Sequence, residues 1–179
     1  LNHAAKFQKM YGNKFNVPII IRTPMGGKRG YGPTHSQNIE KHFLGIPNTQ
    51  VIAINPRHAP KEIYNKILQT IDKPTLIIEN KLDYTRKDTP KKFKGSYKYY
   101  KNNLPIYDLK YSIIKENPDI TVVCWGGLVY ELEEIINDLT EKEEIIVEMI
   151  IPTMLYPLNI KSIKDSVLRT KKILIIEDE

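Results

Sequence analysis

The chain has 179 residues, a net charge of +6 and a single cysteine. Its composition of 41% hydrophobic and 27% charged residues is typical of globular proteins. No stretch approaches the roughly 20 apolar residues of a membrane span, so we expect no contact with a membrane.

In the first half of the chain, amphipathic helix-like segments alternate with apolar strand-like runs. We expect Ser36 to cap the second of these helices and Gly45 to follow its last turn. The predicted elements are a helix over 3–12, a buried strand over 17–22, a helix over 36–45, a strand over 50–56, a helix over 59–71 and a strand over 75–80.

The alternation stops over residues 85–105 and then resumes. Cys124 lies within the run ITVVCW, where we expect a small core residue. One cysteine allows no intrachain disulfide, which fits a reducing compartment, and it gives no support to a zinc site. The second-half predictions are a strand over 119–125, a turn and helix over 126–140, a strand over 144–151, a helix over 159–170 and a strand over 171–179.

Apolar strands separated by helices predict parallel sheets covered on both faces. The fold class is therefore α/β, with two parallel-sheet domains of three layers. We place one domain at residues 1–88, a basic linker at 89–106 and the second domain at 107–179. Both domains would be thin, so we expect further chain at each end or a partner that covers the sheet edges.

The basic segment over residues 86–103 supports an alternative function. Its lysines alternate with Tyr97, Tyr99 and Tyr100, a pattern that can bind a nucleic-acid strand through phosphate contacts and stacking. The alternative protein would be a basic α/β module that binds nucleic acid or an acidic partner. No nucleic-acid motif accompanies the segment, so we favour a solvated linker.

The segment RTPMGGKRGYGPTHSQ, over residues 22–37, follows the first predicted strand. Its glycines match neither a P-loop nor a dinucleotide fingerprint, and Gly126-Gly127 is best explained as a tight turn from strand to helix. Ligands of parallel sheets bind beyond the carboxyl ends of the strands. His35 is therefore the candidate for proton transfer, whereas His3, His42 and His58 are interpreted as surface or partly buried residues.

This segment, together with HFLGIP, KPTLIIENKLDY and DITVVCWGGLVYELEEI, resembles the beta subunit of the thiamine diphosphate-dependent component of 2-oxo acid dehydrogenases, in the transketolase-like superfamily. The resemblance covers nearly the whole chain. It implies that residues 1–88 are the later part of a thiamine-diphosphate-fold pyrimidine-binding domain. Residues 107–179 would be the first part of a transketolase C-terminal domain.

The resemblance also implies a function. The enzyme would oxidatively decarboxylate a 2-oxo acid, pyruvate or a branched-chain one, and pass the acyl group to a lipoyl group. Its cofactor would be thiamine diphosphate, shared with an alpha subunit that holds Mg²⁺. Partners would be this alpha subunit, a lipoyl-bearing acyltransferase and a second beta chain through the C-terminal domain; nucleic acid is not expected. The compartment would be the bacterial cytoplasm or an organellar matrix.

The same resemblance assigns site residues. His35 would face the active site, with the rest of its loop, Gly32, Thr34, Ser36 and Gln37, turned toward substrate and partner. A monovalent cation, K⁺, would bind carbonyl groups near Leu68, Ile71 and Lys73, although Lys73 replaces a residue that is usually acidic or an amide.

Two departures qualify this resemblance. The family's catalytic glutamate would precede Leu1, and the C-terminal domain would continue beyond Glu179, so we expect this chain alone to be inactive. A transketolase or deoxyxylulose-phosphate-synthase fragment is the nearest alternative, and the continuous GPTHSQ favours the dehydrogenase branch. The sequence does not specify which 2-oxo acid is used.

Overall fold

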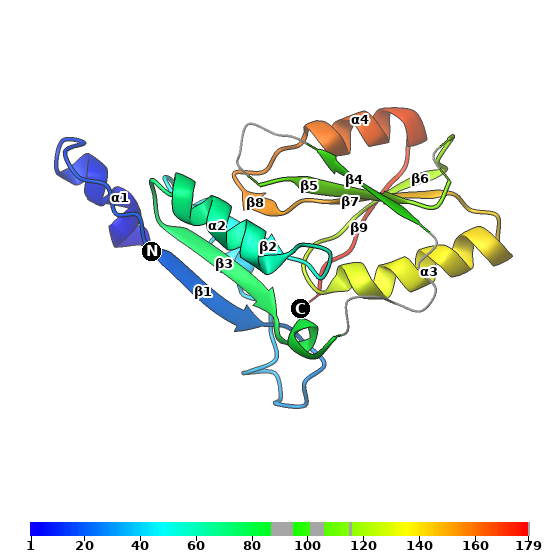
Figure 1. Ribbon diagram of the computed structural model, residues 1–179, viewed down its shortest axis with the longest axis horizontal. Coiled ribbons are helices and arrows are strands. Elements are labelled where there is room, and N and C mark those ends of the chain that lie inside the picture. Colours follow the sequence, from blue (N-terminus) through cyan, green and yellow to red (C-terminus); the bar gives the residue numbers. More distant parts are fainter. Residues whose placement is uncertain (87–94, 101–105, 115, 179) are drawn as a thin grey trace.

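The computed structural model describes residues 1–86, 95–100, 106–114 and 116–178, which form two β-sheets with flanking helices (Figure 1). The first sheet has the strand order β1-β3-β2-β8, and the second has the order β4-β5-β7-β6-β9. The strands are β1 (Ile20–Met25), β2 (Gln50–Ile54), β3 (Thr75–Asn80), β4 (Ser96–Tyr100), β5 (Asp108–Ser112), β6 (Ile120–Val123), β7 (Val147–Ile151), β8 (Met154–Tyr156) and β9 (Ile173–Ile175).

Helices cover both faces of the first sheet. On one face, α2 (Pro60–Thr70) buries Ile63 and Ile67 against Ile52 and Ile77 of the central strands. The opposite face carries a second apolar cluster to which Ile39 and Phe43 contribute, next to the short helix η1 (Glu40–His42). A further helix, α1 (Asn2–Met10), begins the chain, and η2 (Lys81–Thr85) follows β3 directly.

The second sheet lies between α3 (Leu128–Lys142) and α4 (Lys161–Thr170) (Figure 1). The α3 face holds the larger core, which includes Leu132, Ile136, Met149 and Cys124. Cys124 is fully buried, as predicted, and burial raises the pKa of its thiol. On the α4 face, Thr121 Oγ1 is 2.8 Å from the hydroxyls of both Ser166 and Thr170, in a buried polar contact.

The predicted α/β class is confirmed, and each sheet has a parallel core of three strands. Sequence periodicity missed three strands, β4, β5 and β8, which add antiparallel pairs at one side of each sheet. These strands are short or rich in tyrosine and lysine, so they lack the apolar run that marked the others. The strand predicted at 17–22 begins later and is not buried, because β1 pairs only with β3 and leaves Ile21 37% exposed.

The helix predicted over 36–45 is wrong. The segment forms turns and the single 3₁₀ turn η1, so Ser36 caps no helix. The apolar spacing does reflect burial, since Ile39 and Phe43 pack against the sheet. Asn38 Nδ2 instead donates to the backbone oxygen of Asp178 at 2.7 Å, a tertiary contact that replaces local helical hydrogen bonds.

Much of the predicted linker over 89–106 lies outside the described residues. Within it, residues 96–100 form β4, which pairs with β5 from Ser96 opposite Ser112 to Tyr100 opposite Asp108. In the C-terminal half, β8 crosses to the first sheet, where Met154 pairs with Ile52. We retain the division at residues 88 and 107 as a proposal, with β8 as the strand that joins the two parts.

Among the described residues, no helix has both the length and the apolar character needed to cross a membrane. The same part of the chain brings together no three His, Cys, Asp or Glu side chains that could hold a metal ion.

Candidate functional site

The glycine-rich loop begins where β1 ends, at the carboxyl edge of the first sheet. Gly26 has φ +114°, and a Cβ there would lie 2.9 Å from the side-chain amide of Asn80, so only glycine fits this position. Further along, the backbone nitrogens of His35 and Ser36 both donate to Gly32 O, at 3.3 and 3.1 Å. Gly32 has φ +75°, which allows this tight turn.

His35 is exposed on this loop, as are Gly32, Thr34 and Gln37. The side-chain Nε2 of Gln37 donates to Thr34 O at 3.3 Å, which closes the turn around His35. Ser36 differs because its Oγ is buried and makes no hydrogen bond within the described residues. In this loop, the exposed imidazole of His35 is therefore next in sequence to a buried hydroxyl, that of Ser36, which has no hydrogen-bond partner among the described residues.

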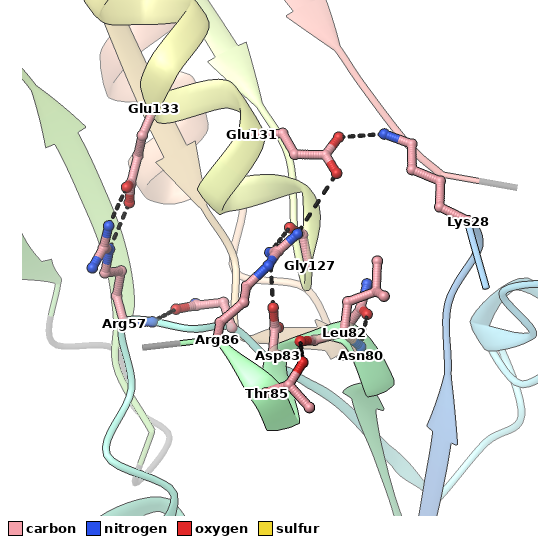
Figure 2. A network of polar contacts seen from close by, with 11 residues as sticks. Lys28, Arg57, Asn80, Leu82, Asp83, Thr85, Arg86, Gly127, Glu131 and Glu133 are labelled. Atoms are coloured by element: carbon pink, nitrogen blue, oxygen red, sulfur yellow. Dashed lines mark hydrogen bonds and ion pairs between the residues drawn. The ribbon is translucent and has the colours of Figure 1, made fainter. Parts of the chain in front are cut away.

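The loop is attached to the C-terminal half at two places. Gly27 N donates to Asp178 Oδ2 at 3.4 Å, and Asn38 binds the backbone of the same residue. Lys28 forms a 2.6 Å ion pair with Glu131 on α3 (Figure 2). These contacts fix both flanks of the turn that carries His35.

Figure 2 shows that Glu131 also faces Arg86, whose Nη2 lies 3.7 Å from the carboxylate. Arg86 Nη1 donates to Asp83 at 2.8 Å and to Gly127 O at 3.2 Å. Gly127 packs against Asn80, where an added Cβ would lie 1.9 Å from Nδ2. Gly126 and Gly127 therefore form the close turn into α3 that their sequence predicts.

A cavity of about 640 Å³ opens at the same edge of the sheet, beside α2, η2 and the first turn of α3. Sequence analysis did not predict it, and His35 does not line it. In its wall, Glu79 accepts hydrogen bonds from Tyr64, Tyr84 and Arg22, with Arg22 Nε at 2.7 Å. Burial raises the pKa of Glu79, but these three donors outweigh it, so the pKa is lowered overall.

Two further polar groups border this cavity. Arg57 follows β2 and makes a bidentate ion pair with Glu133, which joins the loop after β2 to α3 (Figure 2). His58 Nε2 lies 3.3 Å from Thr153 Oγ1, and burial lowers the pKa of its imidazole to about 4. The interpretation of His58 as a partly buried residue is confirmed.

The basic segment is partly used inside the fold. The hydroxyl of Tyr97 donates to Glu133, and its ring lies 5.1 Å from that of Tyr111. This side chain is therefore engaged in the protein interior and does not offer an open stacking face. The side chain of Tyr99 and residues 87–94 lie outside the described part of the chain.

The residues named for a monovalent cation lie at the opposite end of the first sheet from His35. Ile71 ends α2, Leu68 is 63% exposed, and Lys73 O accepts a hydrogen bond from Thr75 Oγ1 at 3.1 Å. A cation there would share this carbonyl with Thr75, so the site stays a prediction.

Comparisons with known proteins show what this chain is similar to. Residues 109–179 match the model of the transketolase C-terminal domain. Over 99% of its length the chain is 27% identical to a protein of Gracilaria tenuistipitata var. liui and 28% identical to one of Acholeplasma laidlawii, both named pyruvate dehydrogenase E1 component subunit beta. The chain spans about half the length of these relatives, 51% in each case.

Solved structures show the same fold. A split-gene transketolase, described as an inactive β4 tetramer, matches with a TM-score of 0.61 and 20% identity over 88% of this chain and 47% of its own. A transketolase from Pichia stipitis matches with a TM-score of 0.60 and 19% identity over 98% of this chain and 24% of its own. The chain therefore has a transketolase-like fold, matches the transketolase C-terminal domain over residues 109–179, and is similar in sequence to pyruvate dehydrogenase E1 beta subunits.

Proposed function

We propose that the chain is part of the beta subunit of a thiamine diphosphate-dependent 2-oxo acid dehydrogenase. Its enzyme would decarboxylate pyruvate or a branched-chain 2-oxo acid and transfer the acyl group to a lipoyl group. The single observation that carries this proposal is the relationship to E1 beta subunits over 99% of the chain, including the loop of His35. A bacterial cytoplasm or an organellar matrix is the compartment that we propose for it.

In this proposal His35 is the residue that acts on the substrate. Its ring is exposed at the carboxyl edge of the first sheet, on a loop held by Asp178 and Glu131. A neutral imidazole can donate or accept a proton near neutral pH. We infer that His35 binds the acyl-bearing centre and passes a proton during lipoyl acylation.

The proposed cofactor fits this chain only in part. No described cluster of His, Cys, Asp or Glu is suited to Mg²⁺, so the diphosphate and its metal would be held by an alpha subunit. In the loop, Ser36 Oγ is a hydroxyl without a hydrogen-bond partner among the described residues, and it would supply a polar group to the cofactor. Thiamine diphosphate, when bound, supplies the electron sink for decarboxylation.

The proposed partners follow from the same relationship. An alpha subunit would complete the site at the loop of residues 26–38, a lipoyl-bearing acyltransferase would receive the acyl group, and a second beta chain would pair through residues 107–179. The exposed β9, with Ile173, Leu174 and Ile175 all 46% exposed or more, is an apolar surface in that region.

The test of His35 uses the full-length beta subunit that would contain this chain, assembled with its alpha subunit. We expect His35→Ala to lower reductive acylation of lipoyl substrate by about 10²-fold, the usual worth of a general acid–base residue, while decarboxylation measured with an artificial oxidant falls far less. His42→Ala is the matched control, because His42 is also exposed but lies on η1. Equal acyl transfer by wild type and His35→Ala would remove the role given to His35.

The nucleic-acid function is the second candidate and is less well supported, because Tyr97 is held by Glu133. A gel shift at low salt with single-stranded DNA and RNA would separate the two candidates. The transketolase alternative differs in chemistry, since it would transfer two-carbon units between sugar phosphates without any lipoyl acceptor.

A further inference from the structure

The cavity beside η2 has the dimensions and position of a small-molecule site. Its volume of about 640 Å³ lies within the roughly 300 to 1,000 Å³ that is usual for ligand pockets. Residues from β1, α2, η2 and α3 line it, so the first sheet and the helix that packs on the second sheet both contribute to its wall. Because His35 is not among these residues, the cavity is separate from the loop to which we assign the chemistry.

The polar part of this wall contains guanidinium groups that are each paired with a carboxylate. Three guanidinium groups line the cavity, those of Arg22, Arg57 and Arg86. The two carboxylates in the wall are already occupied: Glu79 accepts from two tyrosines and Arg22, and Asp83 accepts from Arg86. A ligand that supplies additional acceptors would complement this wall better than one that supplies donors.

Two further polar features lie between the end of β2 and the start of α2. Asn55 is only 2% exposed, and its Oδ1 accepts from Arg57 N at 2.9 Å, which fixes the orientation of the amide. Its Nδ2 is then left without a hydrogen-bond partner among the described residues. Next to it, α2 begins at Pro60 with no side-chain cap, so the positive end of an 11-residue helix borders the cavity.

Tyrosine rings make up much of the remaining wall. The guanidinium of Arg86 lies 4.6 Å from the ring centre of Tyr130, and that of Arg22 lies 5.7 Å from the ring centre of Tyr84. Such rings offer flat apolar faces next to positive charge. The shape therefore favours a ligand with a flat body and a negatively charged end.

We propose that this cavity binds a small anionic ligand that carries a phosphate or carboxylate on a flat, unsaturated body. The charged end meets Arg22 and Arg86, and the body lies among Tyr64, Tyr84 and Tyr130. Carboxylates behind the arginines hold the guanidinium groups in place, which lowers the entropy lost on binding.

Phenyl phosphate is a suitable probe, because it combines both parts, and isothermal titration calorimetry of the full chain measures its binding. We expect saturable binding that is tighter than that of inorganic phosphate or phenol alone. Arg22→Gln should weaken it by about tenfold, the value of one charge-assisted contact. Folding should persist, since Arg22 is 58% exposed and Glu79 retains both tyrosine donors.

Arg29→Gln is the matched control, because Arg29 stacks on Tyr31 in the glycine loop and does not line the cavity. Arg86→Gln provides an independent second variant, and circular dichroism melting curves confirm that each variant folds. Benzoate bound as tightly as phenyl phosphate would assign the site to carboxylates, and preference for phenyl phosphate would assign it to phosphates. Absence of saturable binding, or equal weakening by Arg22→Gln and Arg29→Gln, would overturn the proposal.

Discussion

Arg57, in the loop after β2, and Glu133, on α3, form a bidentate ion pair with side chains only 12% and 2% exposed (Figure 2). Glu133 also accepts from Tyr97, so one buried carboxylate binds groups that follow β2 and lie on β4. Removal of one partner from such a pair leaves a buried charge without compensation. This carboxylate is therefore one of the buried links between the two parts of the chain.

We therefore expect Glu133→Ala to lower the free energy of unfolding by about 3 to 5 kcal/mol, as measured by urea denaturation. Asp138→Ala is the control, because Asp138 pairs with Lys142 on the same helix but both side chains are more than 60% exposed. That exposed pair should contribute about 0.5 kcal/mol or less. Similar losses in both variants would contradict the special role of Glu133.

His58 gives the protein a specific acid sensitivity. Burial lowers the pKa of His58 from 6.5 to about 4, so the unfolded chain binds this proton more readily than the folded one. The free energy of unfolding is therefore unaffected by the protonation of His58 above pH 6.5, and it declines as the pH falls toward 4. At about 1.4 kcal/mol per pKa unit, the loss amounts to about 3 kcal/mol.

Urea denaturation at pH 7 and pH 4.5 measures this effect. The wild type should lose stability between these values, and His58→Gln should show a clearly smaller loss. His42→Gln, at an exposed position, should keep the wild-type loss. The pKa of the Glu79 carboxyl is lowered below its ordinary value of 4.5. The stability that depends on this carboxylate is therefore lost below pH 4.5, outside the range of this experiment. An unchanged loss in His58→Gln would refute the assignment.

At the close turn formed by Gly127, an added side chain would clash with Asn80. We expect a second substitution, at Asn80, to relieve this clash. Gly127 has a helical φ of −68°, so alanine brings no backbone strain, but its Cβ would lie 1.9 Å from Asn80 Nδ2. We expect Gly127→Ala to lower the unfolding free energy by about 1 to 3 kcal/mol through overpacking. Asn80→Ala removes the two nearest obstructing atoms, Nδ2 and Cγ, and leaves Cβ at 2.9 Å.

A double-mutant cycle by thermal denaturation tests this relationship. The combined Asn80→Ala and Gly127→Ala variant should be more stable than the sum of the two single losses implies. Strict additivity of the two stability losses would show that the residues at 80 and 127 do not interact. The loss caused by Gly127→Ala would then have another origin than a clash with Asn80.

The sequence predicted best where burial and local periodicity agree. The strand over 75–80 matches β3 at both ends, because all its residues but the last are buried between two partner strands. The helix over 59–71 matches α2 to within one residue, since proline marks its start and Ile63 and Ile67 its buried face. Here local sequence and tertiary packing favour the same structure.

The candidate site was less predictable because long-range contacts build it. Lys28 meets Glu131 across 103 residues, and Gly27 meets Asp178 across 151. No local pattern reports such pairs. Long-range contacts also explain why the helix predicted at 36–45 is absent, since Asn38 there binds Asp178. They explain as well why the cavity was not predicted, since its wall contains residues as distant in sequence as Arg22 and Tyr130.

Cys124 should be chemically inert in the folded protein. Its side chain is fully buried between the sheet and α3, with Sγ 3.4 Å from Met149 Sδ, and burial raises the pKa of the thiol. Because thiol reagents attack the thiolate, we expect no labelling by a chromogenic disulfide reagent under native conditions and complete labelling in denaturant. Cys124→Ser would place an unpaired hydroxyl among apolar side chains and cost about 1 to 3 kcal/mol, whereas Cys124→Ala should cost less. Rapid native labelling at the rate of an exposed thiol would mean that the α3 face of the second sheet opens far more often than a core of this kind allows.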